Sequence, residues 1–336
     1  MRIARYIGKR LLFILPQLLG IILVSFLLVK MIPGDPAVLM LGPFASDDQL
    51  DRMRSQLGLD GTVLDQFWIY LTGLFQGDLG TSWQTTRPVL EDLLQRFPAT
   101  LELITLSLLL ALLIGIPLGV AAAYFKRSVV KKFSDYYGLL AGALPDFWLG
   151  LVLIYFFYTL LNWVPPPLGR MGIAVLAPPP VTNFVIVDSI IAGNWQALWS
   201  ALGHLVLPVV TLGVINAGPI LKMTQSTMER MLESDIVRYA EMCGLPERQV
   251  IRQAFRNALP SVVTIVSVLY GFLIGGAVLV EIVFSWGGAG QYAVQGVLNA
   301  DINPVLGFVL FSAILSLAIY LIVDLIYFAI DPRIRD

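Results

Sequence analysis

LITLSLLLALLIGIPLGVAAA runs from Leu103 to Ala123, and none of its 21 residues is charged. The hydrocarbon core of a bilayer is about 30 Å thick, so a helix rising about 1.5 Å per residue crosses it in about 20 residues. The backbone polar groups of this stretch would find no water there and must pair within the segment, as they do in a helix. The stretch therefore predicts a transmembrane helix.

Five further stretches have the same apolar character. The composition agrees, because 57% of the 336 residues are hydrophobic and 13% are charged, whereas soluble domains carry about 25% charged residues. An ordinary soluble enzyme and a disordered chain are thereby excluded, and we expect an all-α integral membrane protein with six transmembrane helices. The five other stretches are Leu11–Val29, Phe147–Val164 (starting near Tyr136), Trp199–Leu221, Ala258–Val280 and Val305–Val323.

Two segments resemble spans or leaders but are interpreted otherwise. Gly172–Ile191 is apolar but contains three successive prolines, 178–180, and Asp188. Proline removes helix donors, so we expect a folded external loop there. The basic start of the chain is typical of a signal peptide, yet Leu11–Val29 is long for one and no small-residue cleavage motif follows it, so we expect a retained helix.

Lysine and arginine are distributed unevenly along the chain. Of the 22, 16 lie at the two termini and in the loops after the second and fourth stretches. Because positive residues stay cytoplasmic, we expect both termini in the cytoplasm. The chain then divides into 1–30, the cytoplasmic start and first span; 31–100, a long external loop; and 101–336, a five-helix core with a cytoplasmic loop at about 222–257.

The long external loop is acidic and contains one amphipathic segment. From Asp35 to Arg96 it has nine acids and four bases. Its stretch Val63–Gln76 has apolar residues at helical spacing, which predicts a helix. The sequence does not distinguish whether this helix packs on the bundle or lies on the membrane surface.

Several functional classes are excluded by what the sequence contains. The net charge of −1 offers no field for nucleic acid, and one cysteine and one histidine exclude disulfides within the chain and multi-histidine zinc sites. The phosphate-binding pattern G-x-x-x-x-G-K-[ST] is absent. We therefore expect no catalytic residue, metal or resident cofactor, and any ATP and Mg would be bound by partner subunits.

The cytoplasmic loop at 222–257 has an unusual charge balance. It holds six bases and five acids, where attraction to the membrane would favour a basic excess. Within it, Val237–Leu245 is typical of a helix that stops at Gly244, because glycine is favoured just after a helix and Pro246 cannot easily continue it. We expect a second helix, Glu247–Asn257, to lead into the fifth span. A short helix, a turn and a second helix make a docking element.

This loop resembles the coupling (EAA) loop in the membrane subunits of ABC importers. Ala240, Gly244 and Pro260 fit the pattern, while Arg238 and Tyr239 stand where the generic motif has Glu and Ala. The resemblance implies contact with an ATPase subunit through one set of residues. The set is Arg238, Tyr239, Ala240, Glu241, Gly244 and Leu245.

Other motifs, dispersed in order over nearly the whole chain, resemble the dipeptide/oligopeptide/nickel permease branch, and most of all its dipeptide member. The resemblance implies an ABC importer type I-like permease fold, short peptides as substrate and a multi-pass location in a prokaryotic plasma membrane. The implied partners are a second homologous permease, two ATP-binding subunits and an extracytoplasmic substrate-binding protein. The motifs include 32–36 (IPGDP), 77–82 (GDLGTS), 256–260 (RNALP), 281–286 (EIVFSW) and 331–335 (DPRIR).

Ionisable groups within spans are candidates for the pathway. Asp146 follows Pro145 in the third span, and pathway lining and a structural or helix-capping role are both open for it. About 14 residues separate it from Lys132, roughly 21 Å of continuous helix, which weakens the capping reading. Glu281 matches a family position at the outer end of the fifth span and could face the substrate pathway. Glu102, at the outer start of the second, is expected in the headgroups.

The third outer loop, 284–303, has no Lys or Arg and is rich in glycine. It resembles a family segment that dips toward the pathway, which implies that Trp286, Gly288 and Gly290 contact the binding protein or block back-flow. Glycine permits tight bends there. Three G-x-x-x-G pairs, including Gly115 and Gly119, allow close helix contacts, either within the chain or with a partner.

Other functions fit less well but stay open. Nickel or haem is an alternative cargo for the same type of importer. A secondary transporter usually shows inverted repeats and coupling charges in mid-membrane. An intramembrane protease would need paired catalytic groups that this sequence lacks.

Overall fold

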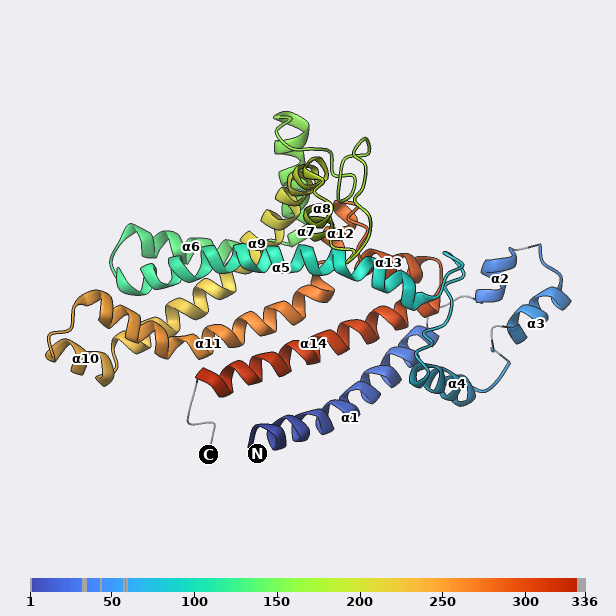
Figure 1. The fold of residues 1–336 in the computed structure, drawn as a ribbon, viewed down its shortest axis with the longest axis horizontal. Helices are drawn as coiled ribbons and strands as arrows, with labels where there is room; N and C mark the ends of the chain where they lie inside the picture. The colour runs from blue at the N-terminus through green and yellow to red at the C-terminus, as the bar shows by residue number, and fades with distance from the viewer. Residues whose placement is uncertain (1, 32–34, 43, 57, 59, 331–336) are drawn as a thin grey trace. The chain divides into compact units, whose positions relative to one another are not determined.

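The computed structural model describes residues 2–31, 35–42, 44–56, 58 and 60–330 (Figure 1). Regular structure in this part is helical, apart from one isolated bridge between Thr81 and Pro88, so the all-α prediction is confirmed. The helices are α1 (Arg2–Lys30), α2 (Pro36–Leu41), α3 (Asp47–Gln56), α4 (Val63–Phe75), α5 (Val89–Tyr124), α6 (Val129–Ala143), α7 (Asp146–Leu153), the π-helical η1 (Ile154–Leu160), α8 (Val185–Ile191), α9 (Trp195–Leu232), α10 (Asp235–Met242), α11 (Glu247–Gly276), α12 (Val278–Val283), α13 (Ala289–Leu298) and α14 (Ile302–Ile330).

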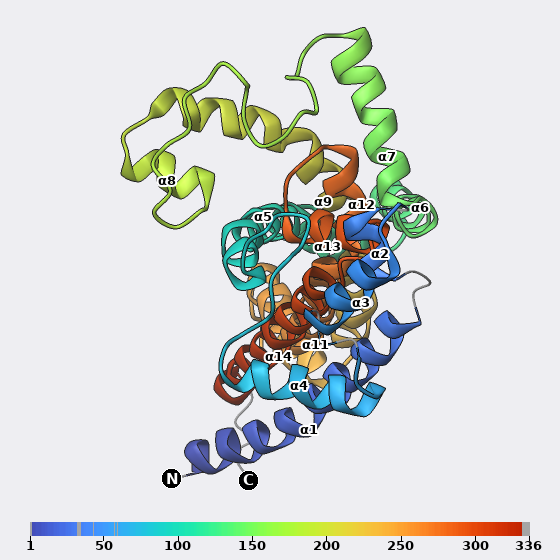
Figure 2. The same ribbon diagram turned by 90° about the vertical axis from the view of Figure 1, so that its right-hand side faces the viewer.

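Among the described residues, five single helices are long and apolar enough to cross a membrane, and there are six candidate spans if one bent pair is counted as a single span. The five are α1, α5, α9, α11 and α14. The pair is α6 followed by α7 and η1, whose axes differ by 103°, and Figure 2 shows α7 leaving the end of α6. Leu144 is extended, with φ −92° and ψ 132°, as expected for a residue that precedes proline. Six spans were predicted, but the third is not straight.

Helix ends differ from prediction in and after the 222–257 segment. α9 continues to Leu232, and α11 runs from Glu247 through Pro260 to Gly276 without a break. Residues 222–232 of the expected loop therefore belong to α9, and residues 247–257 belong to α11. The fifth span was expected to reach Val280, but α11 ends at Gly276. The last residues of the expected span, from Val278, belong to the separate helix α12.

Two segments outside the spans behave largely as predicted. Gly172–Ile191 does not form a span, because it is irregular up to Phe184 and helical only in α8. Val63–Gln76 is helical as predicted, over the range of α4. Thr62 and Asp65 form a reciprocal capping box at its start, which satisfies free N–H groups of the first turn.

The described chain divides into two compact units, 1–99 with 287–318 and 100–286 with 319–336, here called unit 1 and unit 2. In unit 1, Phe26, Val29 and Leu306 form a buried cluster. Phe67 and Tyr70 of α4 pack against it, and both rings contact the Phe26 ring. One side of α4 thus packs on α1 within the unit.

Unit 2 is organised around α9, which contacts α6, α7, α8 and α11. α5 approaches it closely at two glycines. A Cβ on Gly115 would lie 2.9 Å from the Ala217 carbonyl oxygen, and one on Gly119 would lie 2.8 Å from that of Leu221. This G-x-x-x-G pair therefore makes a contact within the chain.

Candidate coupling surface and pathway residues

The helix and stop predicted within residues 222–257 are present as α10 and its C-terminal turn. Gly244 has φ +72°, and its N–H donates to the Glu241 carbonyl at 2.9 Å. The Leu245 N–H donates to the Ala240 carbonyl at 3.2 Å, which completes a Schellman motif. Pro246 then occupies the N-cap of α11. The turn at Gly244 thus fixes how α10 joins α11.

One face of α10 is anchored to the long helices. Val237 and Ala240 are 2% and 3% exposed, and they belong to a cluster with Met228 of α9 and with Val250 and Ala254 of α11. Leu245 packs against the same cluster. A displacement of α10 would therefore also displace the side chains of α9 and α11 that pack against it.

The opposite face of α10 is exposed and partly apolar. Ile236, Tyr239 and Met242 are 54%, 70% and 81% exposed, and Arg238 and Glu241 are exposed beside them. Exposed apolar side chains gathered on one helix are typical of an interaction surface. A cavity of about 440 Å³ adjoins this face and is lined by Asp235, Ile236, Tyr239, Ala240, Cys243, Leu245 and Gln253.

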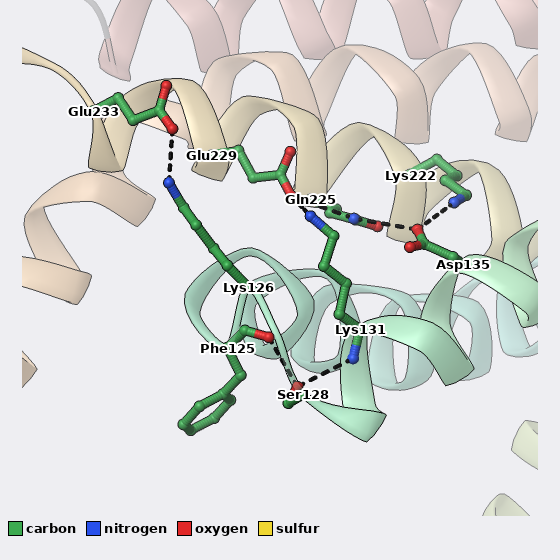
Figure 3. A network of polar contacts seen from close by, with 9 residues as sticks. All are labelled: Phe125, Lys126, Ser128, Lys131, Asp135, Lys222, Gln225, Glu229 and Glu233. Atoms are coloured by element: carbon green, nitrogen blue, oxygen red, sulfur yellow. Dashed lines mark hydrogen bonds and ion pairs between the residues drawn. The ribbon is translucent and has the colours of Figure 1, made fainter.

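Ion pairs tie Lys126, just after α5, and Lys131 of α6 to the end of α9 (Figure 3). Lys126 Nζ lies 2.6 Å from a carboxylate oxygen of Glu233, and Lys131 Nζ lies 2.9 Å from one of Glu229. The hydrogen bond from Lys126 and its positive charge lower the pKa of Glu233. Two acids at the end of α9 thus pair with bases just after α5 and on α6.

A third pair continues this network along α9. Lys222 Nζ lies 2.9 Å from Asp135 Oδ1. The Gln225 side-chain amide donates to the same Asp135 oxygen at 3.3 Å and to Glu229 at 3.4 Å. Sequence reasoning found the charge balance but not these partners, because they lie about 90 residues apart in the chain.

Asp146 is the first residue of α7, directly after the N-cap Pro145, and it is half-buried at the 103° bend. The expectation of a continuous helix from Lys132 to Asp146 is wrong, because the chain is extended at Leu144. A carboxylate at a helix N-terminus is favoured by the helix dipole. This position agrees with the structural role, and both that role and pathway lining stay predictions.

Glu281 lies on α12 and is 0% exposed. Its Oε1 accepts a hydrogen bond of 2.5 Å from the Thr100 hydroxyl, and its backbone carbonyl accepts one of 2.8 Å from the Trp286 N–H. A buried carboxylate persists only where hydrogen bonds or charge compensate for lost hydration. Glu281 is therefore an enclosed group in this structure, and its role on the pathway stays a prediction.

Glu102 forms a buried ion pair, and its expected place at headgroup depth stays a prediction. It is 7% exposed, and its Oε2 lies 3.0 Å from Arg170 Nη2. Its Oε1 accepts a hydrogen bond of 3.0 Å from the Ile186 N–H, while Arg170 also donates to the Asn183 carbonyl. These contacts hold the loop before α8 against α5 at Glu102.

The predicted gate residues lie around the start of α13, which occupies half of the expected glycine-rich loop. Trp286 is 1% exposed. Gly288 is the N-cap of α13, and Gly290 is buried in its first turn. The left-handed conformation falls on Gly287, with φ +73°. The gating role itself stays a prediction.

Among the described residues, no three His, Cys, Asp or Glu side chains are grouped so that they could hold a metal ion.

The chain matches two family descriptions that together cover almost all of it. Residues 115–336 match the family described as binding-protein-dependent transport system inner membrane component. Residues 3–104 match the N-terminal family of the same membrane components. The first match covers about two thirds of the chain, including α9, α10 and α11.

Several curated proteins are similar along almost the full chain. The probable D,D-dipeptide transport system permease protein DdpB of Escherichia coli (strain K12) is 40% identical over 316 residues, which cover 94% of this chain and 93% of that protein. The dipeptide transport system permease protein DppB of the same strain is 36% identical over 336 residues, or 98% of each. DppB of Alkalihalophilus pseudofirmus is 35% identical over 334 residues, covering 98% and 99%. The chain therefore belongs to the family of inner membrane components of binding-protein-dependent transport systems.

Proposed function

We propose that this chain is one permease subunit of an ATP-driven importer for short peptides. The observation that carries the proposal is 35–40% identity, over nearly the whole length, to permeases whose names specify dipeptide transport. In this proposal a second permease completes the pathway, and an extracytoplasmic binding protein delivers the peptide. Two ATPase subunits bind ATP and Mg.

α10 is the proposed contact with an ATPase subunit. Its exposed Ile236, Tyr239 and Met242 offer apolar area to a partner, while Arg238 and Glu241 offer charges at the rim. Burying such a patch between proteins is favourable because apolar surface leaves water. The buried Val237 and Ala240 would pass a displacement of α10 to α9 and α11.

The transport proposal is tested by reconstituting the chain with its partner subunits and binding protein in lipid vesicles. We expect uptake of a radiolabelled dipeptide that requires ATP and is blocked by excess unlabelled dipeptide. Uptake of nickel or haem without competition by peptides would assign the chain to a different cargo. Uptake driven by a proton or sodium gradient without ATP would contradict the importer class.

The coupling proposal is tested by Met242→Glu, which places a charge on the exposed apolar face of α10. We expect weaker ATPase attachment and lower uptake, with the permease still inserted in the membrane. Val129→Glu is the matched control, because Val129 is equally exposed, at 82% against 81%, but lies on α6. Equal uptake by the two variants would contradict the role of α10.

A further inference from the structure

The helix α4 carries an apolar surface that its contact with α1 does not use. Phe67 and Tyr70 pack on Phe26, yet none of the residues 63–75, all of which the structure describes, is buried. A second set of apolar side chains follows the helix at spacings of four, three and four residues, which places them on one side of it. This set, here called the outer stripe, consists of Leu64, Trp68, Leu71 and Phe75.

The outer stripe is largely exposed in the described structure. Leu64, Trp68 and Phe75 are 75%, 64% and 83% exposed. At about 100° per residue, the stripe lies roughly a quarter of the helix circumference away from Phe67 and Tyr70. A surface helix that only packs on its own bundle needs one apolar stripe, so the second stripe requires another apolar environment.

The rest of the α4 surface is mostly polar. Asp65 and Thr72 lie there, and the Asp65 side chain belongs to the capping box with Thr62. Ile69 is the apolar exception on this side. Asp65 is the single charged residue in the sequence of α4, and the outer stripe contains none. The helix thus has one side on α1, one side that is apolar and exposed, and one polar side.

The contact with α1 sets the depth of α4 in the membrane. Gln66, Phe67 and Tyr70 lie within about one turn of α4, and they contact Phe26 and Lys30 in the last turns of α1. α4 therefore crosses the end of α1 instead of running along it, and Figure 1 shows α4 beside that end. α1 is a candidate span that ends at Lys30, and a lysine at the end of a span reaches the headgroup level.

These observations favour lipid over a protein partner as the cover of the outer stripe. Leu27 and Leu28 of α1, next to the contact with α4, are exposed, as expected of a span that faces lipid. The stripe lies at the end of this lipid-facing surface, and indole rings such as that of Trp68 are favoured at the membrane–water interface. A partner that binds and leaves usually meets a surface as polar as the rest of the protein, whereas this stripe has no polar side chain other than the indole.

We propose that α4 is an interfacial anchor, whose outer stripe inserts into the membrane surface at the end of α1 while Asp65 and Thr72 face water. The charge distribution predicts that this surface belongs to the outer leaflet. Insertion depends on apolar area and not on attraction to anionic lipid, because α4 contains no Lys or Arg. The proposal requires α1 to be a span but does not depend on the cargo or on the ATPase subunits, so it goes beyond the proposed function.

Spin labels on the full-length chain in nanodiscs of palmitoyl-oleoyl phosphatidylcholine test the proposal. In a Cys243→Ser background, Leu64→Cys and Phe75→Cys carry the label on the outer stripe, and Ile69→Cys and Thr72→Cys carry it on the polar side as controls. Collision of the label with oxygen, which concentrates in hydrocarbon, is compared with collision with a water-soluble nickel chelate. We expect the ratio of oxygen to nickel accessibility to be several-fold higher on the stripe than at the controls.

Two results of this measurement would overturn the proposal. Equal ratios at the stripe and control positions would show that α4 stands in water. Low collision with both reagents at the stripe positions would show that protein, and not lipid, covers the outer stripe.

A charge in the outer stripe provides a second measurement. Trp68→Glu places a carboxylate on the stripe, and Ile69→Glu is the matched control, because Trp68 and Ile69 are 64% and 63% exposed but lie on different sides of α4. We expect hydrogen exchange of residues 63–75 in the nanodiscs to become several-fold faster in Trp68→Glu than in Ile69→Glu, because a carboxylate is costly in the apolar part of the interface. Equal exchange in the two variants would overturn the anchor.

Discussion

Asp188 of α8 shows how one carboxylate organises the loop that precedes its helix. It is 3% exposed and accepts hydrogen bonds from the hydroxyl and N–H of Thr182, at 2.7 and 2.8 Å, and from the N–H groups of Val181 and Asn183. Burial acts to raise the pKa of Asp188, but these hydrogen bonds outweigh it and lower the pKa. The ionised form therefore stabilises the loop.

Replacing Asp188 should change how the loop responds to acid. Because its folded pKa is lowered, its stabilisation is complete above the ordinary aspartate pKa of about 3.9 and is lost as pH falls through the lower folded pKa. We expect Asp188→Asn to cost about 1–3 kcal/mol at pH 7 and to reduce the loss of stability in acid. Hydrogen exchange of residues 172–191 at several pH values measures this. Glu241→Gln, at an exposed acid, is the control, and an equal response of the two variants would contradict it.

Gly244 offers a second residue-scale prediction. Its left-handed conformation penalises any side chain, so Gly244→Ala should destabilise the end of α10 by about 1 kcal/mol. Gly142→Ala is the matched control, because Gly142 is helical and its added Cβ would meet nothing within 4 Å. Protease cleavage between α10 and α11 should increase only in the first variant, and no difference would argue against the Schellman turn.

At the scale of elements, the apolar stretches predicted the positions of the spanning helices but not their ends. Six windows correspond to five single helices and one bent pair. The continuation of α9 past Leu221 escaped prediction because Lys222, Gln225 and Glu229 are polar. Their distant partners lie on α6. Contacts between residues so distant in the chain cannot be predicted from the local sequence.

Close packing of α5 on α9 gives an element-scale prediction. A Cβ on Gly119 would lie 2.8 Å from the Leu221 carbonyl oxygen and 2.7 Å from Thr224 Cβ, so Gly119→Ala must push the helices apart. We expect a loss of about 1–3 kcal/mol in thermal unfolding. Gly275→Ala is the control, because its Cβ would have open space. A melting temperature unchanged from wild type in Gly119→Ala would exclude this contact.

At the scale of the whole molecule, the sequence predicted the class of protein better than its site. The turn at Gly244 was predictable because glycine and proline mark helix ends locally. The buried pair of Glu102 and Arg170 was not, because 68 residues separate the two. Of the predicted coupling residues, Arg238, Tyr239 and Glu241 are exposed, whereas Ala240 is buried and Leu245 packs against the same cluster. Residue type alone did not reveal this division.

The single cysteine makes the orientation of the molecule measurable. Cys243 is exposed at the end of α10, and the charge distribution predicts that α10 is cytoplasmic. A membrane-impermeant maleimide should label inside-out vesicles and not right-side-out vesicles, with Cys243→Ser as the unlabelled control. Labelling from the outside would reverse the predicted topology. Protection of Cys243 when ATPase subunits are added would support the proposed coupling contact.

The length of α9 has a consequence for the lipid around the protein. Its apolar part, from Trp195 to the last residue before Lys222, is about 40 Å long at 1.5 Å per residue, against a hydrocarbon thickness of about 30 Å. A helix longer than the local thickness adapts by tilting or kinking, and Pro208 lies within this part. Membrane thickness therefore helps to set the tilt of α9. A thicker or thinner bilayer should shift the attachment point of α10 sideways in the plane of the membrane.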